Sequence, residues 1–220
     1  MQSFSRLVMA VSTATLALLA GCANISAKVI NFNAWPADAG GGAFSFITPE
    51  SRVHDLEQQT YEDYVGAELS RRGLKEAAAG QPARFLVDVG AAGGTKNKTF
   101  LEPVYSNQLI YVPPYQVRGG GVYGGYWAPD QFGSRYIGDR EVTRTVNTAR
   151  LKVRILDTTK GSAGRPAPVF ETLATYEGDE EDLPEVVPFL TRAMFENFPG
   201  ANGRVTVVKY DPRTGEKLRK

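Results

Sequence analysis

The chain has 220 residues, of which 25 are lysine or arginine and 24 are aspartate or glutamate, so its formal net charge is +1. This balance excludes the strongly basic surface of a nucleic-acid-binding protein, and we predict no nucleic-acid partner. Cys22 is the only cysteine and His54 the only histidine, which excludes an intramolecular disulfide and a histidine-rich metal site. We therefore expect no metal and no cofactor. The length fits one domain with a substantial core.

The first 21 residues have the pattern of a cleaved export signal. Arg6 makes the start positive, residues 7–19 are largely apolar, and small residues precede Cys22. The apolar run is shorter than the about 20 residues of a membrane-spanning helix, so we predict a signal peptide over residues 1–21. The four residues that end this segment resemble a bacterial lipobox: Leu19, Ala20, Gly21 and Cys22. The resemblance implies a diacylglyceryl group on the Cys22 thiol and usually a further acyl chain on its amine.

Lipid on Cys22 predicts a membrane as one partner of this protein. Stable anchoring takes more than one acyl chain, and each buried methylene contributes about 0.8 kcal/mol. Ala23 follows the cysteine, and in lipoproteins of the enterobacterial type an aspartate there would favour the inner membrane. By this analogy we expect a lipid-anchored cell-envelope protein at the outer membrane, facing the periplasm. The alternative is an ordinary secretory leader in which Cys22 is incidental.

Residues 22–28 are expected to form the lipidated N-terminus and a short tether. Alternation of apolar and polar side chains then predicts three strands, over residues 29–35, 43–48 and 85–91. A helix is expected over residues 55–72, where Asp55 and Gln58 have capping-box spacing and Glu62 falls on the polar face.

The second half of the chain repeats these patterns. Three more strands are expected over residues 140–157, 169–176 and 204–210. A second helix with strong apolar spacing covers residues 183–198, and Pro188 places its regular start near Glu185. This order indicates an α+β fold, a mainly antiparallel sheet with two helices packed on one face. We expect a single domain over residues 29–212 and a charged tail over residues 213–220.

Residues 105–136 are rich in tyrosine, glycine and proline, which predicts a long loop inserted into the domain. Amphipathic rings on such a loop offer contact area to an envelope protein, a glycan or a lipid headgroup. The candidate binding residues are Tyr111, Tyr115, Tyr123, Tyr126 and Trp127. The alternative is an irregular flap whose rings pack back on their own domain.

A row of basic residues at even positions forms a second candidate surface: Arg140, Arg144, Arg150, Lys152 and Arg154. Such a row suits anionic lipid or lipopolysaccharide. It also suits pairing with acidic side chains on neighbouring strands, for which Glu171 and Glu177 are available.

Several short stretches resemble the domain-of-unknown-function 4136 lipoproteins of Gram-negative bacteria. They are Asp-Leu-Glu-Gln-Gln-Thr-Tyr-Glu at 55–62, Ala-Glu-Leu at 67–69 with Gly73, Ala-Arg-Phe-Leu-Val at 83–87, and Phe-Pro-Gly with Asn-Gly within 198–203. The resemblance implies placement in the envelope and a fold, and it supplies no catalytic residues. His54, at the start of the first helix, is expected to cap or pack.

Two classes of function follow from these observations. The first is a non-enzymatic, membrane-anchored binding or assembly module. The alternative is a glycan-acting hydrolase with paired carboxylates, which needs neither histidine nor metal.

Overall fold

The structure is a computed structural model that describes residues 24–78, 80–106, 109–129, 134–162, 164–178 and 182–219. The lipobox residues Leu19, Ala20, Gly21 and Cys22 lie outside the described residues. The chain divides into two compact units, one with the described residues up to Thr95 and from Asn147 onward, the other Lys96–Val146. The second of these units includes the insertion expected at residues 105–136.

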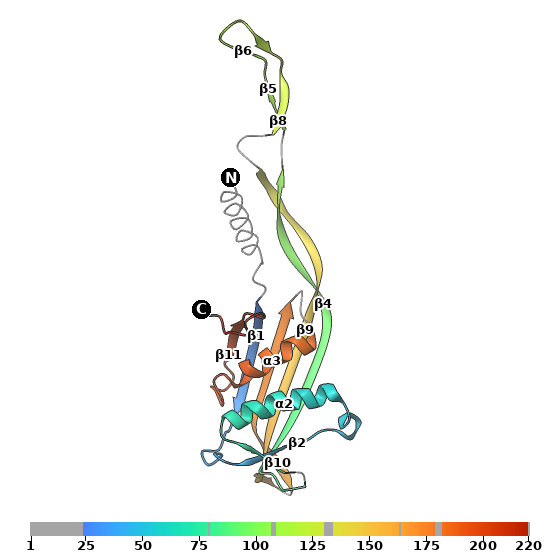
Figure 1. The fold of residues 1–220 in the computed structure, drawn as a ribbon, viewed down its shortest axis with the longest axis vertical. Helices are drawn as coiled ribbons and strands as arrows, with labels where there is room; N and C mark the ends of the chain where they lie inside the picture. The colour runs from blue at the N-terminus through green and yellow to red at the C-terminus, as the bar shows by residue number, and fades with distance from the viewer. Residues whose placement is uncertain are drawn as a thin grey trace, which may run out of the picture. The chain divides into compact units, whose positions relative to one another are not determined.

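A seven-stranded sheet forms the first unit, in the order β11-β1-β10-β9-β4-β2-β3 (Figure 1). Its strands are β1 (Ile25–Asn33), β2 (Ala43–Phe46), β3 (Lys75–Glu76), β4 (Phe85–Ser106), β9 (Arg135–Ser162), β10 (Arg165–Gly178) and β11 (Val205–Tyr210). Strands β11, β1, β10 and β9 pair antiparallel, whereas β2 pairs parallel with β3 and β4. The mainly antiparallel α+β fold is confirmed, with a mixed edge.

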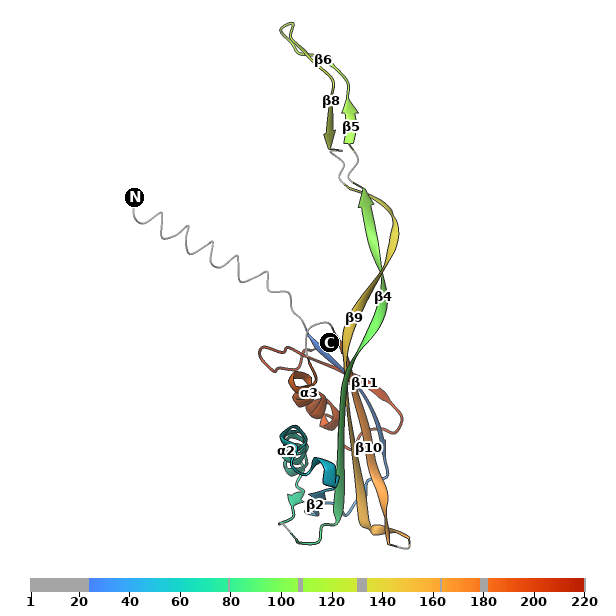
Figure 2. The same ribbon diagram turned by 90° about the vertical axis from the view of Figure 1, so that its right-hand side faces the viewer.

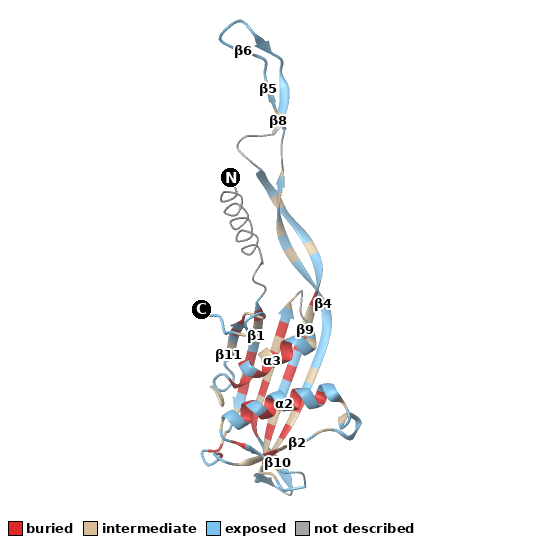
Figure 3. Ribbon diagram, in the orientation of Figure 1, coloured by how far each residue is buried: buried red, intermediate tan, exposed pale blue. Residues whose placement is uncertain are grey.

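Two α-helices cover one face of this sheet, α2 (Leu56–Arg71) and α3 (Leu183–Phe195), and a 3-10 turn, η2 (Glu50–Arg52), precedes the first (Figure 2). The inward side chains of β9, namely Leu151, Val153 and Ile155, are fully buried and alternate with exposed or half-buried neighbours. Figure 3 shows this alternation across the sheet. The core therefore lies between the helices and one sheet face.

Helix α2 begins as expected but buries polar residues that the helical pattern places outside. The Asp55 carboxylate accepts hydrogen bonds from the backbone N–H of Glu57 (3.0 Å) and Gln58 (3.4 Å). The Gln58 side chain does not complete a capping box, because it is buried and donates to Glu62 (2.7 Å) and to the Val89 carbonyl of β4 (3.0 Å). The expectation that Glu62 is exposed is wrong: it is buried, and its carboxylate accepts hydrogen bonds from Gln58 and from the Thr48 hydroxyl (2.9 Å).

Helix α3 is confirmed, with a different start. It begins at Leu183 rather than near Glu185, and Pro184 occupies the first turn. A proline there loses no helical hydrogen bond, because the first turn lacks acceptors for its N–H groups. Pro188 lies inside the helix.

Strand β1 begins earlier than expected. Residues 25–28, placed in the tether by sequence, form its first half, and Ile25 and Ala27 are buried. They lie opposite Tyr210 and Val208 of β11, which pairs along this part of β1. Ser26 and Lys28 alternate with these buried residues, so the period of the predicted strand continues to Ile25, where β11 pairs with it.

The second unit consists of paired strands. Its segments of β4 and β9 continue from the first unit, β5 (Leu109–Val112) pairs with β8 (Tyr126–Pro129), and β6 (Tyr115–Gln116) pairs with β7 (Val122–Tyr123). The irregular loop expected over residues 105–136 is therefore not confirmed. Tyrosine, valine and tryptophan favour strands, and the glycines of this segment favour turns between them. No helix of the described residues has the length and apolar character needed to cross a membrane.

Candidate functional site

The five candidate aromatic residues lie on the hairpin formed by residues 109–129, which we call the aromatic ribbon. Their side chains are between 48% and 66% exposed. Tyr111 faces Trp127 across the strands with 5.4 Å between ring centroids, and Tyr115 stacks on Tyr123 at 5.7 Å. Tyr126 lies opposite Val112. The structure thus joins four of the five rings into cross-strand pairs and leaves all five accessible.

Both faces of the paired strands β5 and β8 are apolar. One face carries Leu109, Tyr111 and Trp127, and alternation puts Ile110, Val112, Ala128 and Tyr126 on the other. Arg118 is the only charged residue in the aromatic ribbon. This surface offers apolar area and tyrosine hydroxyls to a partner and little charge.

The basic row is mostly paired. Arg140 (3.6 Å) and Arg144 both form ion pairs with Glu102, and Arg154 lies 3.3 Å from a carboxylate oxygen of Asp88. The acidic partners in these three pairs are Glu102 and Asp88, where the sequence offered Glu171 and Glu177. Arg150 and Lys152 are exposed, and no carboxylate of the described residues lies within 4 Å of either.

A buried ion pair joins the start of β4 to β9. Asp157 is fully buried, and its carboxylate accepts hydrogen bonds from Arg84 (3.1 Å) and from the Thr159 hydroxyl (2.6 Å). Burial by itself would raise the pKa of Asp157, but the Thr159 and Arg84 hydrogen bonds outweigh it and lower this pKa. Arg84 also bonds Asp38 at 3.0 Å. This arrangement holds the two strands in place.

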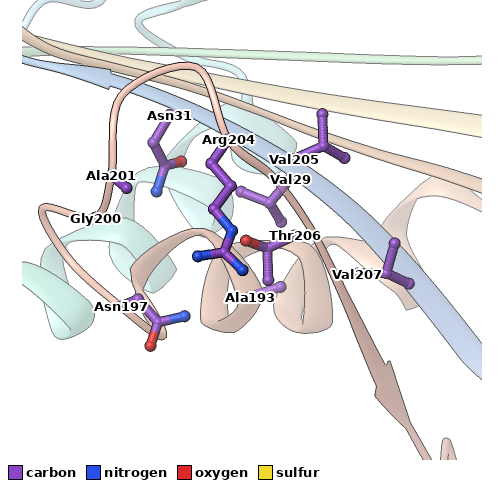
Figure 4. Close-up of a pocket in the computed structure, with 10 residues that line it drawn as sticks. All are labelled: Val29, Asn31, Ala193, Asn197, Gly200, Ala201, Arg204, Val205, Thr206 and Val207. Atoms are coloured by element: carbon purple, nitrogen blue, oxygen red, sulfur yellow. The ribbon is translucent and has the colours of Figure 1, made fainter.

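A pocket of about 450 Å³ lies between α3 and the edge strand β11 (Figure 4). Val29 and Asn31 of β1 and Thr206 of β11 form its floor, and Ala193 and Asn197 line it from α3 and the residues after it. The loop from Gly200 to Arg204 borders it. This loop is held by Asn33, which donates to the carbonyls of Pro199 (3.1 Å) and Gly200 (2.8 Å).

The polar groups of this pocket include unused hydrogen-bond donors. Arg204 is exposed, and no carboxylate of the described residues forms an ion pair with it. Asn31 is 9% exposed, and its Oδ1 accepts from the Thr172 hydroxyl (2.6 Å), while its Nδ2 has no acceptor among the described residues. None of the described residues that line the pocket is acidic.

Sequence reasoning missed this pocket. Arg204 falls in the last expected strand, and Asn31 is distant from it along the chain. The one available signal was the Phe-Pro-Gly and Asn-Gly stretch within 198–203, which carries the family resemblance and forms the bordering loop.

Other expected chemistry finds no assembled site in the described part of the chain. His54 is exposed, and the capping role belongs to its neighbour Asp55. No cluster of three or more histidine, cysteine, aspartate or glutamate side chains among these residues could hold a metal ion. Of the pockets next to α3 and β11, one contains a single carboxylate, Glu196, and the other none.

Comparison with known proteins gives a family for the chain. No curated protein matches it. A solved PDZ domain protein from Parabacteroides distasonis is similar over 84% of this chain, with 14% identity and a TM-score of 0.47. This chain covers 38% of that one. The model of the Domain of unknown function (DUF4136) family matches residues 28–200, so the chain belongs to the DUF4136 family.

Proposed function

We propose that this protein is a membrane-anchored cell-envelope lipoprotein that acts as a non-enzymatic binding or assembly module. In this proposal lipid on Cys22 holds the protein at the outer membrane, facing the periplasm, and the aromatic ribbon contacts a partner. The observation that carries the proposal is the exposure of the five paired or adjacent rings.

The start of β1 supports the anchoring part. Ile25 is 1% exposed and lies only three positions after Cys22. Consecutive Cα atoms are about 3.8 Å apart, so a stretch of three residues can span at most about 11 Å. A lipid there would hold the first unit directly at a membrane surface rather than on a long tether.

The aromatic ribbon supports the binding part. A two-stranded hairpin alone is marginally stable in water, and large exposed apolar patches mark interaction sites. The rings have apolar bodies and, in the tyrosines, polar hydroxyls. A protein, a glycan or a layer of lipid headgroups that covers the aromatic ribbon would therefore gain contact area and stabilise it.

Fractionation of cells tests the anchor. We expect Cys22→Ser to move the protein from the membrane to the soluble fraction, while Asn24→Ser, two residues further on, leaves it in the membrane. Membrane association of the Cys22→Ser protein at the wild-type level would contradict the anchor.

Crosslinking in intact envelopes tests the aromatic ribbon. A photoreactive residue at Tyr123 or Trp127 should give specific crosslinked products, and the same residue at Lys152, on the exposed sheet face, should not. Equal product patterns from both positions would rule out the aromatic ribbon as the contact surface.

A further inference from the structure

We propose that the pocket between α3 and β11 binds the carboxyl terminus of an extended peptide, which pairs with the free edge of β11 while its carboxylate contacts Arg204. The residues of this pocket and of β11 all belong to the first unit, so peptide binding there depends on neither the lipid on Cys22 nor the aromatic ribbon.

Strand β11 ends the sheet and has an open edge. It pairs with β1 on one side. On the other side the described residues contribute only a short bridge between Tyr210 and Lys217, next to which the N–H of Leu218 donates to the Lys209 carbonyl (2.8 Å). On this side, no strand of the described residues pairs with the first part of β11.

The alternation of backbone groups shows which residues face this open edge. In a strand, the N–H and C=O groups of successive residues point to opposite sides. The carbonyl of Lys209 points away from β1, because it accepts from Leu218. Val207 and Val205, at steps of two, therefore direct their backbone groups to the open edge, while Thr206 pairs with Val29 of β1.

The same residues border the pocket. Figure 4 shows the side chains of Val205 and Val207 directed away from that of Thr206, which enters the pocket. The two valines thus meet the pocket with their backbone. A peptide strand paired with them would lie across its mouth, and its alternate side chains would enter above Thr206 and Ala193.

The positive charge at the pocket indicates which end of the peptide binds there. Arg204 precedes β11 and has no acidic partner among the described residues, and its guanidinium matches a carboxylate with two parallel hydrogen bonds. Asn31 is 9% exposed, and its Nδ2 is a further donor without an acceptor in the described part of the chain. Since Arg204 is at the beginning of β11, the peptide runs antiparallel to β11 and ends there.

Binding of peptides to the full chain, purified in detergent, tests this proposal. The probe is an array of pentapeptides in which the last two positions carry every amino acid, each made with a free carboxyl terminus and as the amide. We expect a subset of the peptides to bind at least about tenfold more tightly with the free carboxyl terminus than as the amide, because the amide loses a hydrogen bond to a charged group. Arg204→Ala should cause the same loss.

Two controls separate the pocket from general effects. Arg150→Ala removes an exposed arginine that has no acidic partner among the described residues, on the opposite sheet face, and should leave binding unchanged. For a bound peptide, hydrogen exchange should slow at the backbone amides of Val205 and Val207 and stay unchanged at that of Thr206, which is already paired with β1.

Three results would overturn the proposal. One is an array with no peptide bound above its amidated counterpart, and another is unchanged binding by Arg204→Ala. The third is equal affinity for a single acetylated amino acid with a free carboxylate, which would show a small-molecule site without strand pairing.

Discussion

Removal of the aromatic ribbon should leave the first unit folded. We consider the replacement of residues 109–129 by an Asn-Gly turn. None of the described side chains in this range is buried, so the first unit loses no core contact. The free energy of unfolding of the first unit should change by less than about 1 kcal/mol. For a domain of this size that corresponds to at most about 2–4 °C in the melting temperature.

A core substitution provides the scale for this comparison. Phe170 is 1% exposed, and its ring centroid lies 4.7 Å from that of Phe198 and 6.0 Å from that of Phe195. Phe170→Ala should cost about 3–5 kcal/mol, which lowers the melting temperature by about 6–20 °C. Thermal unfolding followed by circular dichroism measures both changes. If the shortened chain melted as early as Phe170→Ala, the aromatic ribbon would be part of the core rather than a contact surface.

Three further predictions concern stability, each measured by urea unfolding. The pKa of Asp157 is lowered in the folded state, so its contribution to the free energy of unfolding is complete above about pH 5 and disappears as the pH falls below about 4. Asp157→Asn should therefore reduce the loss of stability at acid pH. An unchanged dependence of stability on pH would refute this role of Asp157. Gly42→Ala would place a Cβ 2.6 Å from the Phe85 ring and should lower the free energy of unfolding by about 1–3 kcal/mol. Gly40→Ala should lower it by less, because the space around a Cβ at that position is open. Asp55→Ala should cost about 1 kcal/mol, most of which Asp55→Ser restores.

Local patterns predicted the elements whose periodicity is strong. The strict alternation at Leu151, Val153 and Ile155 identified β9, and the apolar spacing around Val187 and Leu190 identified α3. Both elements bury one face, which requires apolar residues at a regular spacing, and this spacing can be read from residues close together in the sequence. The acidic start of α2 was predictable for the same reason, since a cap acts within one helical turn.

The second unit shows where composition misled. Glycine and proline at positions such as Gly124 and Pro113 favour turns, and they indicated an irregular loop. The strands of the aromatic ribbon consist of only two to four residues, and cross-strand pairs such as Tyr111 with Trp127 support them. A pattern that short has no period to detect, so pairing decides the conformation.

The sequence by itself determined the family, the α+β class, the signal-like leader that ends at Cys22 and the concentration of aromatic residues. Tertiary structure decided the burial of Glu62, the early start of β1 and the pocket at Arg204. The reason is the range of the interactions. Helical and strand periods depend on residues a few positions apart, whereas the pocket requires β11 to pair with β1, across more than 170 positions, with α3 packed beside them.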